Sequence, residues 1–366
     1  MTYPLFFCPS IEGGGVEKNL YLISDYLVKQ NQKVHIITAN KNMKKHFNKN
    51  VIFICPNSNK WSFSNRIIKI FICALLFIKM KKNFLIISFQ ANVFAIILAK
   101  LFNLKVIVRA NTAPEKFVNS FFKKLIFMFF FKMADCVIVN SFDFKKSLKK
   151  YLGINSKVIY NPIKKKIYKN KNIFKKNLNI INVWRLTEQK NHIFLLKTLS
   201  KLDKKFKWTL KIVGKGNLKK KIKLFIKKNY LSKKVRLVGY KSNAIYEISK
   251  SDLFILSSIY EGLPNVLIEA QQTGTPIIST DCRTGPREIL MNGKLGELVK
   301  INNETQLLNK IKNFYINKKI LYNKASLAKK YLYRFDYKNN CESYKNLIGK
   351  FTWMYAKSKN ISYYSC

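Results

Sequence analysis

This sequence of 366 residues lacks several patterns, and each absence argues against a class of site. No Asp-X-Asp occurs, so no closely spaced pair of carboxylates is offered to a divalent cation and its diphosphate ligand. The three histidines stand far apart, which argues against a histidine-rich metal site. The seven cysteines are scattered and form no Cys-X-X-Cys, so they are interpreted as small buried residues of a reducing compartment. We therefore expect no metal and no other cofactor.

Long apolar runs are also missing. The longest, at 67–78, 84–99 and 125–131, fall short of the roughly 20 residues that a membrane-spanning helix needs. The first residues carry neither a basic segment nor a cleavage site, so no signal peptide is expected. Together with the reduced cysteines, these absences favour a cytoplasmic protein.

Acidic residues are scarce, at 18 against 69 basic residues, and the formal net charge is +51. The chain is rich in Lys, Ile, Asn and Phe together, as coding bias in an AT-rich genome would produce. Attraction to an anionic membrane surface is a second interpretation. Nucleic-acid binding is a third, but no nucleic-acid module signature is present, and we expect no such partner. Coding bias and membrane attraction both remain open.

Residues 251–288 combine a strand, a helix and a second strand. The first apolar run predicts a buried strand, a helix then begins at Pro264 and ends at Gly274, and a β-branched run ending at Thr280 predicts the next strand. Such a βαβ unit indicates a parallel sheet. Ligands of parallel sheets bind beyond the carboxyl ends of the strands, which is where Glu261 lies.

The N-terminal half starts with a similar alternation. An apolar run near the start is followed by a loop that contains Gly13, Gly14 and Gly15, and then by a predicted helix over 16–30. Glycine lets the backbone come close to a phosphate or a sugar, and a helix N-terminus presents free N–H groups. A plain strand-to-helix turn would explain the same glycines.

The residues around Glu261 resemble a known family. EGLPNVLIEA, in which Glu261 and Glu269 stand eight positions apart, resembles the E-x7-E motif of the retaining family 4 glycosyltransferases. TDCRTGPREIL resembles its continuation in bacterial members that build surface polysaccharides and lipid-linked oligosaccharides. GGGVEK resembles the family's Gly-Gly-X-Glu loop, and RLTEQKN resembles its diphosphate-binding segment, although Trp184 precedes it where relatives usually have glycine.

The resemblance implies the GT-B fold, an α/β architecture with two Rossmann-like domains whose parallel sheets face a central cleft. A basic, weakly hydrophobic segment at 163–178 predicts the boundary between the domains. We expect an acceptor-side domain over 1–165 and a nucleotide-sugar-binding domain over 166–335. A C-terminal helix over 336–366, with its tail, is expected to cross back to the first domain.

The resemblance also implies roles for individual residues. Glu261 would hold hydroxyls of the donor sugar, while Arg185 and Lys190 would hold its diphosphate and stabilise the charge that develops on it. Glu269 would bind the ribose. The remaining residues implied in nucleotide-sugar binding are Gly13, Gly14, Gly15, Gly214, Gly239, Leu263, Pro264 and Asn265. Arg109 and Asn111 would stand on the acceptor side.

The implied activity is transfer of a hexosyl or N-acetylhexosaminyl group from a UDP-linked donor to a glycan acceptor, which is lipid-linked in many relatives. A nucleotide-sugar 2-epimerase on the same fold is an alternative, although it needs a histidine-rich site. A non-catalytic basic protein that binds membrane or nucleic acid is another, but it leaves Glu261 and Glu269 unexplained.

The stretch 117–133 predicts a helix with an aromatic body and lysines at 123, 124 and 132. As an interfacial helix it would hold the chain on an anionic membrane surface, peripheral to the cytoplasmic face of the bacterial inner membrane. As a buried helix it would fill the core of the first domain. Both interpretations remain open.

Overall fold

The computed structural model describes residues 2–11, 14–80, 83–111, 121–166, 168 and 177–358, with 353–358 described by their backbone alone. The chain divides into two compact units. Unit 1 comprises Met1–Lys164 and Phe335–Cys366, and unit 2 comprises Lys165–Arg334. The boundaries expected from the sequence lie within one residue of these.

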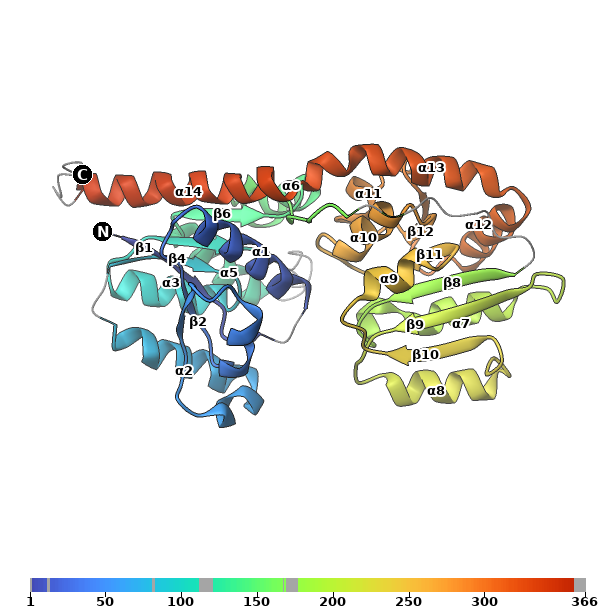
Figure 1. Ribbon diagram of the computed structural model, residues 1–366, viewed down its shortest axis with the longest axis horizontal. Coiled ribbons are helices and arrows are strands. Elements are labelled where there is room, and N and C mark those ends of the chain that lie inside the picture. The colour runs from blue at the N-terminus through green and yellow to red at the C-terminus, as the bar shows by residue number, and fades with distance from the viewer. Residues whose placement is uncertain are drawn as a thin grey trace. The chain divides into compact units, whose positions relative to one another are not determined.

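Unit 1 contains a seven-stranded parallel sheet with the strand order β3-β2-β1-β4-β5-β6-β7 (Figure 1). Its inner strands are short, apolar and buried, as expected of a sheet covered on both faces. The strands are β1 (Tyr3–Phe7), β2 (His35–Ile37), β3 (Ile52–Ile54), β4 (Phe84–Ser88), β5 (Val106–Arg109), β6 (Cys136–Val139) and β7 (Lys157–Val158).

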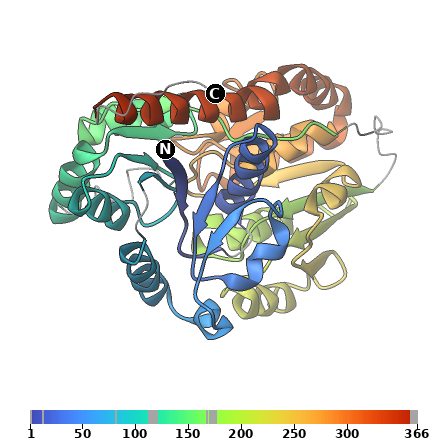
Figure 2. The same cartoon turned by 60° about the vertical axis from the view of Figure 1, so that its left-hand side comes forward.

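Helices cover both faces of this sheet (Figure 2). One core packs α2, α3, α5 and α6 against the strands, and a second core packs α1 and α14 against the other face. The last helix therefore belongs to unit 1, where it packs on α1. The helices are α1 (Gly15–Lys29), α2 (Arg66–Ile78), α3 (Asn92–Leu101), α5 (Phe121–Met133), α6 (Phe142–Leu152) and α14 (Tyr337–Ser358), with the 3₁₀ turns η1 (Lys41–His46) and η2 (Asn59–Phe63).

Unit 2 contains a six-stranded parallel sheet with the order β10-β9-β8-β11-β12-β13. Its strands are β8 (Leu178–Val183), β9 (Trp208–Val213), β10 (Val235–Gly239), β11 (Leu253–Leu256), β12 (Ile277–Thr280) and β13 (Glu297–Val299). Its helices are α7 (His192–Ser200), α8 (Lys219–Lys228), α9 (Ala244–Ser249), α10 (Asn265–Thr273), α11 (Pro286–Ile289), α12 (Glu304–Ile316) and α13 (Lys318–Lys330), with η3 (Glu188–Lys190); η4 (Tyr331–Phe335) leads out of the unit.

The βαβ unit expected at 251–288 is present as β11, α10 and β12. β11 and β12 pair in parallel, and α10 ends at Gly274, which adopts a left-handed conformation with φ 68°. The predicted fold class, two α/β domains with parallel sheets, is confirmed.

None of the helices in the described part of the chain is long and apolar enough to cross a membrane. The six cysteines that the structure describes are free thiols, and four of them are buried. Burial of free cysteines in this way agrees with their interpretation as small apolar residues.

Candidate functional site

The carboxyl edge of the unit 2 sheet brings Lys190 and Glu261 together. β8 leads through η3 to Lys190, and the neighbouring strand β11 leads to Glu261. The Nζ of Lys190 lies 2.6 Å from Oε1 of Glu261, and the two side chains are 3% and 5% exposed. Two residues 71 positions apart therefore form a buried ion pair at the edge where ligands of parallel sheets bind.

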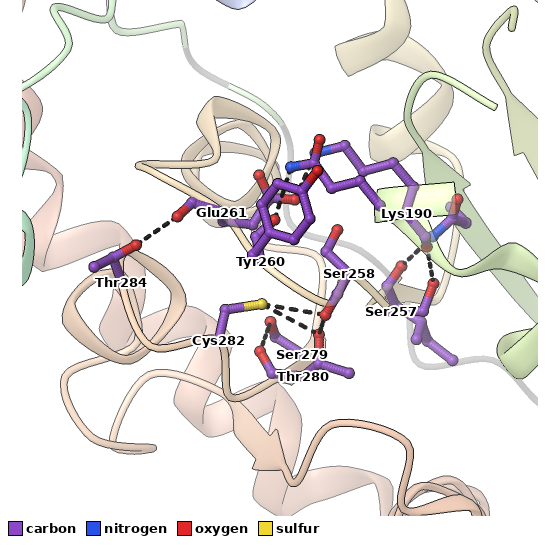
Figure 3. A network of polar contacts seen from close by, with 12 residues as sticks. Lys190, Ser257, Ser258, Tyr260, Glu261, Ser279, Thr280, Cys282 and Thr284 are labelled. Carbon is purple, nitrogen blue, oxygen red and sulfur yellow. Dashed lines mark hydrogen bonds and ion pairs between the residues drawn. The ribbon is translucent and has the colours of Figure 1, made fainter. Parts of the chain in front are cut away.

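Hydrogen bonds hold the backbone on both sides of this pair (Figure 3). The Ser257 hydroxyl donates to the carbonyl of Lys190 at 2.8 Å. The N–H of Ile259 donates to the carbonyl of Gln189 at 2.9 Å, and Gln189 Nε2 donates to the carbonyl of Tyr260 at 2.7 Å. The loop after β11 is thereby tied to η3, so the ion pair stands on a fixed backbone.

The segment after β12 holds the same loop from its other side. The Thr280 hydroxyl donates to the carbonyl of Ser258 at 2.6 Å, and the Cys282 thiol donates to the same oxygen at 3.2 Å. Thr284 donates to the carbonyl of Glu261. No role was predicted for these side chains from the sequence, although they stand in the conspicuous segment TDCRT.

Lys190 is held in surroundings that penalise its charge. Burial lowers the pKa of Lys190, the charge of Arg185 adds to the lowering, and Glu261 opposes it. The indole ring of Trp184 lies with its centroid 3.4 Å from Nζ, where the ring face favours a cation. The amine of Lys190 therefore contacts the carboxylate of Glu261 and the ring face of Trp184.

Two other reactive side chains near the pair are poor nucleophiles at neutral pH. Burial, followed by the charge of Glu261, raises the pKa of Cys282 to about 12, so its thiol stays protonated. Burial, followed by the charge of Lys190, lowers the pKa of His192 to about 4, so its imidazole stays neutral. The chemistry of this edge therefore depends on charge and position.

Arg185 lies two residues beyond the end of β8 and is exposed. Within the described ranges of the chain, no side chain or backbone group bonds to its guanidinium. Its contribution to the lowered pKa of Lys190 shows that the two cations lie within electrostatic reach. The edge thus combines a buried ammonium with an exposed guanidinium, whose fork of donors suits the oxygens of a phosphate.

Two of the predicted glycines occupy positions that a side chain would disturb. Gly214 has a φ of 151°, and a Cβ built there would lie 1.8 Å from the carbonyl oxygen of Trp184. Gly239 has a φ of 80°, and its carbonyl accepts the N–H of Gly214 at 2.8 Å. The carboxyl ends of β8, β9 and β10 therefore approach one another closely.

The start of α10 contains the other predicted residues of unit 2. Leu263 is buried, Pro264 caps the helix where no N–H is needed, and Asn265 is its first residue. Glu269 lies one turn further and is only 9% exposed. Glu269 is therefore not an ordinary solvent-exposed residue of this helix.

The predicted glycine loop belongs to unit 1. Gly13 lies outside the described residues, while Gly14 caps α1 and Gly15 begins it, both of them exposed. A Cβ on Gly14 would lie 2.8 Å from Oε2 of Glu17, and the other carboxylate oxygen, Oε1, accepts a hydrogen bond from Nε2 of Gln90 at 2.9 Å. A small residue at Gly14 therefore lets the chain pass close over a buried carboxylate.

Arg109 and Asn111 also belong to unit 1, and their positions differ from one another. Arg109 is almost fully buried and donates to Tyr344 at 3.0 Å, to Asn161 at 2.5 Å and to the side chain of Asn111. Asn111 is half-buried and donates to the carbonyl of Phe89 at 2.6 Å. Arg109 is thus a buried support for Asn111, and the structure gives it no open face toward an acceptor.

No group of three or more His, Cys, Asp or Glu side chains that could hold a metal ion occurs in the part of the chain that the structure describes. A reaction without metal stays a prediction. Arg185 and Lys190 are two cations that this edge can offer to an anionic ligand.

Two α/β units, one with cations at the carboxyl edge of its sheet, define a protein suited to hold an anionic ligand at that edge. The chain belongs to the group 1 glycosyl transferases. Residues 163–331 match the family described as "Glycosyl transferases group 1", and residues 13–166 match "Glycosyltransferase Family 4". The predicted family is therefore confirmed, and unit 2 coincides with the first match.

Individual relatives agree with this assignment. An uncharacterized glycosyltransferase of Methanocaldococcus jannaschii is 36% identical over 220 residues, which cover 53% of each chain. The N-acetylgalactosamine-N,N'-diacetylbacillosaminyl-diphospho-undecaprenol 4-alpha-N-acetylgalactosaminyltransferase of Campylobacter jejuni is 30% identical over 55% of this chain and 56% of its own length. The chain thus spans about half the length of these two curated relatives.

A solved structure reproduces the fold over nearly the whole chain. Anabaena HepE, in complex with UDP and glucose, superposes with a TM-score of 0.78 at 18% identity, and the match covers 96% of this chain and all of that one. At this level of identity the likeness concerns the fold alone.

Proposed function

We propose that this chain is a retaining glycosyltransferase that moves a sugar from a UDP-linked donor to a glycan acceptor. The observation that carries the proposal is the buried Lys190–Glu261 pair, with exposed Arg185 beside it, at the carboxyl edge of unit 2. A nucleotide-diphosphate sugar presents an anion to the two cations and hydroxyl groups to the carboxylate. One edge of the sheet can therefore meet both parts of such a donor.

The reaction places the largest change of charge on the diphosphate. As the bond to the sugar breaks, the departing nucleotide diphosphate gains negative charge, and fixed cations stabilise that state more than the ground state. Arg185 and Lys190 are proposed to supply this charge, while Glu261 holds the sugar near its anomeric carbon and Glu269 holds the ribose. Gly13, Gly14 and Gly15 are proposed to close over the donor.

Retention of configuration is proposed to need no protein nucleophile. Cys282 has a protonated thiol, and Glu261 is engaged with Lys190 at 2.6 Å, so neither is poised to attack the sugar. A same-face displacement assisted by the leaving phosphate, the mechanism usually proposed for the family, suits a site whose contribution is fixed charge.

The acceptor is proposed to be lipid-linked, in the synthesis of a bacterial surface polysaccharide or lipid-linked oligosaccharide. This proposal is supported by the Campylobacter relative, whose name describes transfer to a diphospho-undecaprenol-linked glycan. A UDP-linked donor is supported by the solved complex of HepE. Either a hexose or an N-acetylhexosamine would suit the site. The enzyme would act in the cytoplasm, peripheral to the inner membrane.

The test supplies the purified chain with UDP-hexoses, UDP-N-acetylhexosamines and a polyprenyl-diphosphate-linked glycan. UDP release and the anomeric configuration of the new bond, read by NMR, are the measurements. We expect acceptor-dependent UDP release and a product with the configuration of the donor. Glu261→Gln should lower turnover by about 100-fold, whereas Glu304→Gln, on the remote helix α12, should not change it.

Each other outcome has a definite meaning. A product of inverted configuration would contradict retention, and failure to release UDP from every donor would contradict the proposed donor class. A C2 epimer of the donor, formed without acceptor, would instead support a nucleotide-sugar epimerase.

A further inference from the structure

Acidic residues are almost absent from one long part of unit 1. Between residues 26 and 134 the only carboxylate side chain is Glu115, against 19 Lys and Arg, whereas the other 17 acidic residues lie outside this range. Coding bias toward lysine raises the number of basic residues throughout the chain. It does not by itself explain why carboxylates avoid this range and occur elsewhere.

Three helices from this range cover the same face of the unit 1 sheet. The inner sides of α2, α3 and α5 contribute to a single core, for example through Cys73, Ala95 and Phe131. The rings of Phe77 in α2 and Phe102 at the end of α3 lie 5.5 Å apart, and α3 also packs against α5. The three helices therefore form one layer, and α2, α3 and α5 are all labelled in Figure 1.

The outer side of this layer is apolar. In α2 the exposed residues Ile67, Phe71, Leu75 and Ile78 recur at the spacing of one helix face. The apolar face is completed from η2, α3 and α5, and its side chains are between 39% and 85% exposed. Its members are Trp61, Phe63, Ile67, Ile68, Phe71, Leu75, Ile78, Phe94, Leu101, Phe102, Phe121, Phe122, Leu125, Ile126 and Phe129.

Basic residues accompany this apolar face. Arg66 and Lys79 stand at the two ends of α2, and Lys123, Lys124 and Lys132 lie on α5; the helices α2, α3 and α5 contain no acidic residue. Large exposed apolar patches on soluble proteins mark interaction sites. The combination of aliphatic, aromatic and basic side chains without carboxylates is typical of surfaces that enter the headgroup region of a bilayer.

Charge also discriminates between the partners that could cover this apolar face. A second copy of the chain would set one acid-free basic surface against another, and like charges in apposition oppose such contact. A nucleic acid would satisfy the cations but would leave the phenylalanines and isoleucines in water. An anionic bilayer suits both the basic and the apolar side chains, because its headgroups contact the lysines and its acyl boundary takes up the apolar side chains.

We propose that the apolar face of α2, α3 and α5 docks unit 1 on an anionic lipid bilayer. The prediction from 117–133 concerned one helix alone, whose residues 117–120 lie outside the described ranges; the structure extends the candidate surface to three helices. The inference deepens the proposed function, on which it rests for the lipid-linked acceptor. Binding itself is measurable without donor or acceptor.

The test is co-sedimentation of the full chain with vesicles of phosphatidylcholine alone or with added phosphatidylglycerol, at two salt concentrations. We expect binding that requires phosphatidylglycerol and weakens with salt. Phe71→Glu combined with Phe122→Glu should lower binding by at least ~10-fold, because two apolar anchors become charges that the headgroups repel. Lys123→Gln with Lys124→Gln should lower it by about 10-fold.

The matched control is Leu224→Glu combined with Ile316→Glu, which changes exposed apolar residues of α8 and α12 in unit 2. It should bind vesicles as the unsubstituted chain does. Circular dichroism and melting temperature should stay unchanged in each variant, since the substituted side chains lie on the surface. Turnover of a soluble acceptor analogue, measured in parallel, keeps failure of docking distinct from failure of catalysis.

Salt-independent binding, binding to neutral vesicles alone, or equal loss in the control would overturn the proposal. So would a self-associated chain that the Phe71→Glu and Phe122→Glu variant converts to a monomer without any vesicle binding by the parent. Retention of a nucleic acid in place of vesicles would likewise assign the basic surface to another partner.

Discussion

At the scale of single residues, the Lys190–Glu261 pair is costly for the fold. Removing two charges from water carries a penalty that their attraction only partly repays, so a buried pair is weak evidence for stability. Perturbed ionisable groups cluster at functional sites, and here the perturbed amine stands at the ligand-binding edge of a parallel sheet. Function therefore explains the pair better than stability does.

The first prediction concerns the amine itself. Lys190→Ala should lower turnover by about 100-fold, because one preorganised cation is lost. It should also lower the melting temperature, because Glu261 is left buried without its cation, at a cost of about 3 kcal/mol. Adding Glu261→Gln should recover stability but not turnover. Steady-state kinetics and thermal unfolding measure the two effects, with Lys197→Ala on α7 as the control.

Near-normal turnover of the Lys190→Ala variant would exclude its proposed role at the diphosphate. A loss of turnover in Lys197→Ala of similar size would show that the lysines act only through general charge.

The second prediction concerns Trp184, whose ring faces Lys190 Nζ at 3.4 Å. Only the protonated amine attracts a diphosphate, so kcat/KM should fall as pH rises through the lowered pKa of Lys190. Trp184→Leu removes a ring face that favours the cation, so the fall should begin at a lower pH. Trp184→Phe keeps an aromatic face and should shift it less.

The charged and titratable neighbours set the sign of this effect. Glu261 and Cys282 raise the pKa of Lys190, Arg185 lowers it, and His192 is neutral over the range of interest. The unsubstituted chain, Trp184→Leu and Trp184→Phe differ only in the side chain that faces the amine. Profiles of kcat/KM against pH that coincide for the unsubstituted chain and both variants would show that Trp184 does not position the amine.

Sequence and resemblance indicated Lys190 and Glu261, but not the side chains that hold them. Charged residues in the loops that follow predicted strands are visible from spacing alone, because the ends of parallel strands define the edge of the sheet. Thr280, Cys282 and Thr284 act by bonding to carbonyls more than 20 residues away, and such partners depend on how β11 and β12 pack. Burial of Arg109 likewise depends on Tyr344, far along the chain.

At the scale of elements, the loop that carries Glu261 depends on a close backbone contact. Gly285, the cap of α11, has a φ of 87°, and a Cβ there would lie 2.0 Å from the carbonyl oxygen of Gly262. Gly293 has a similar φ of 91°, but a Cβ there would lie 3.8 Å from its nearest neighbour, the carbonyl oxygen of Gly296. A side chain at either glycine would strain the backbone, because both have a positive φ. Only at Gly285 would the added Cβ also collide with a neighbouring atom.

The third prediction follows from this difference. Gly293→Ala should cost about 1 kcal/mol from left-handed strain alone. Gly285→Ala should destabilise unit 2 more and should also lower turnover, because Gly262 adjoins Glu261 and must move. Thermal unfolding and kinetics of both variants are the measurements. Equal losses of stability with unchanged turnover would mean that this contact does not position the Glu261 loop.

The helices and strands that the sequence predicted are mainly those with long or buried apolar runs. β11, α10 and β12 have buried apolar runs with glycine and proline at their limits, and their order was visible in the sequence. The edge strands β3 and β13 were not predicted. Each has three residues and a single neighbouring strand, so neither needs the continuous apolar run that marks a buried strand.

At the scale of the whole molecule, the C-terminal segment of the chain belongs to unit 1, together with the N-terminal half. α14 packs on α1, Tyr26 donates to Glu342 at 2.5 Å, and Tyr344, Leu347 and Ile348 complete one core of unit 1. No local pattern in α14 specifies this return, which came from the family resemblance. The boundary at 163–178, by contrast, was visible as a change in composition.

The central claim is that the carboxyl edge of unit 2 binds a nucleotide diphosphate through cations of the chain, without a metal. Calorimetric titration of UDP in excess chelator tests it most directly, on the unsubstituted chain, Arg185→Ala and Arg236→Ala. Arg236 is an exposed arginine on β10 and serves as the matched control. We predict that UDP binds, that Arg185→Ala weakens binding by about 10-fold or more, and that Arg236→Ala does not. Binding that requires added Mg²⁺ or Mn²⁺, or that both variants weaken equally, would contradict the account.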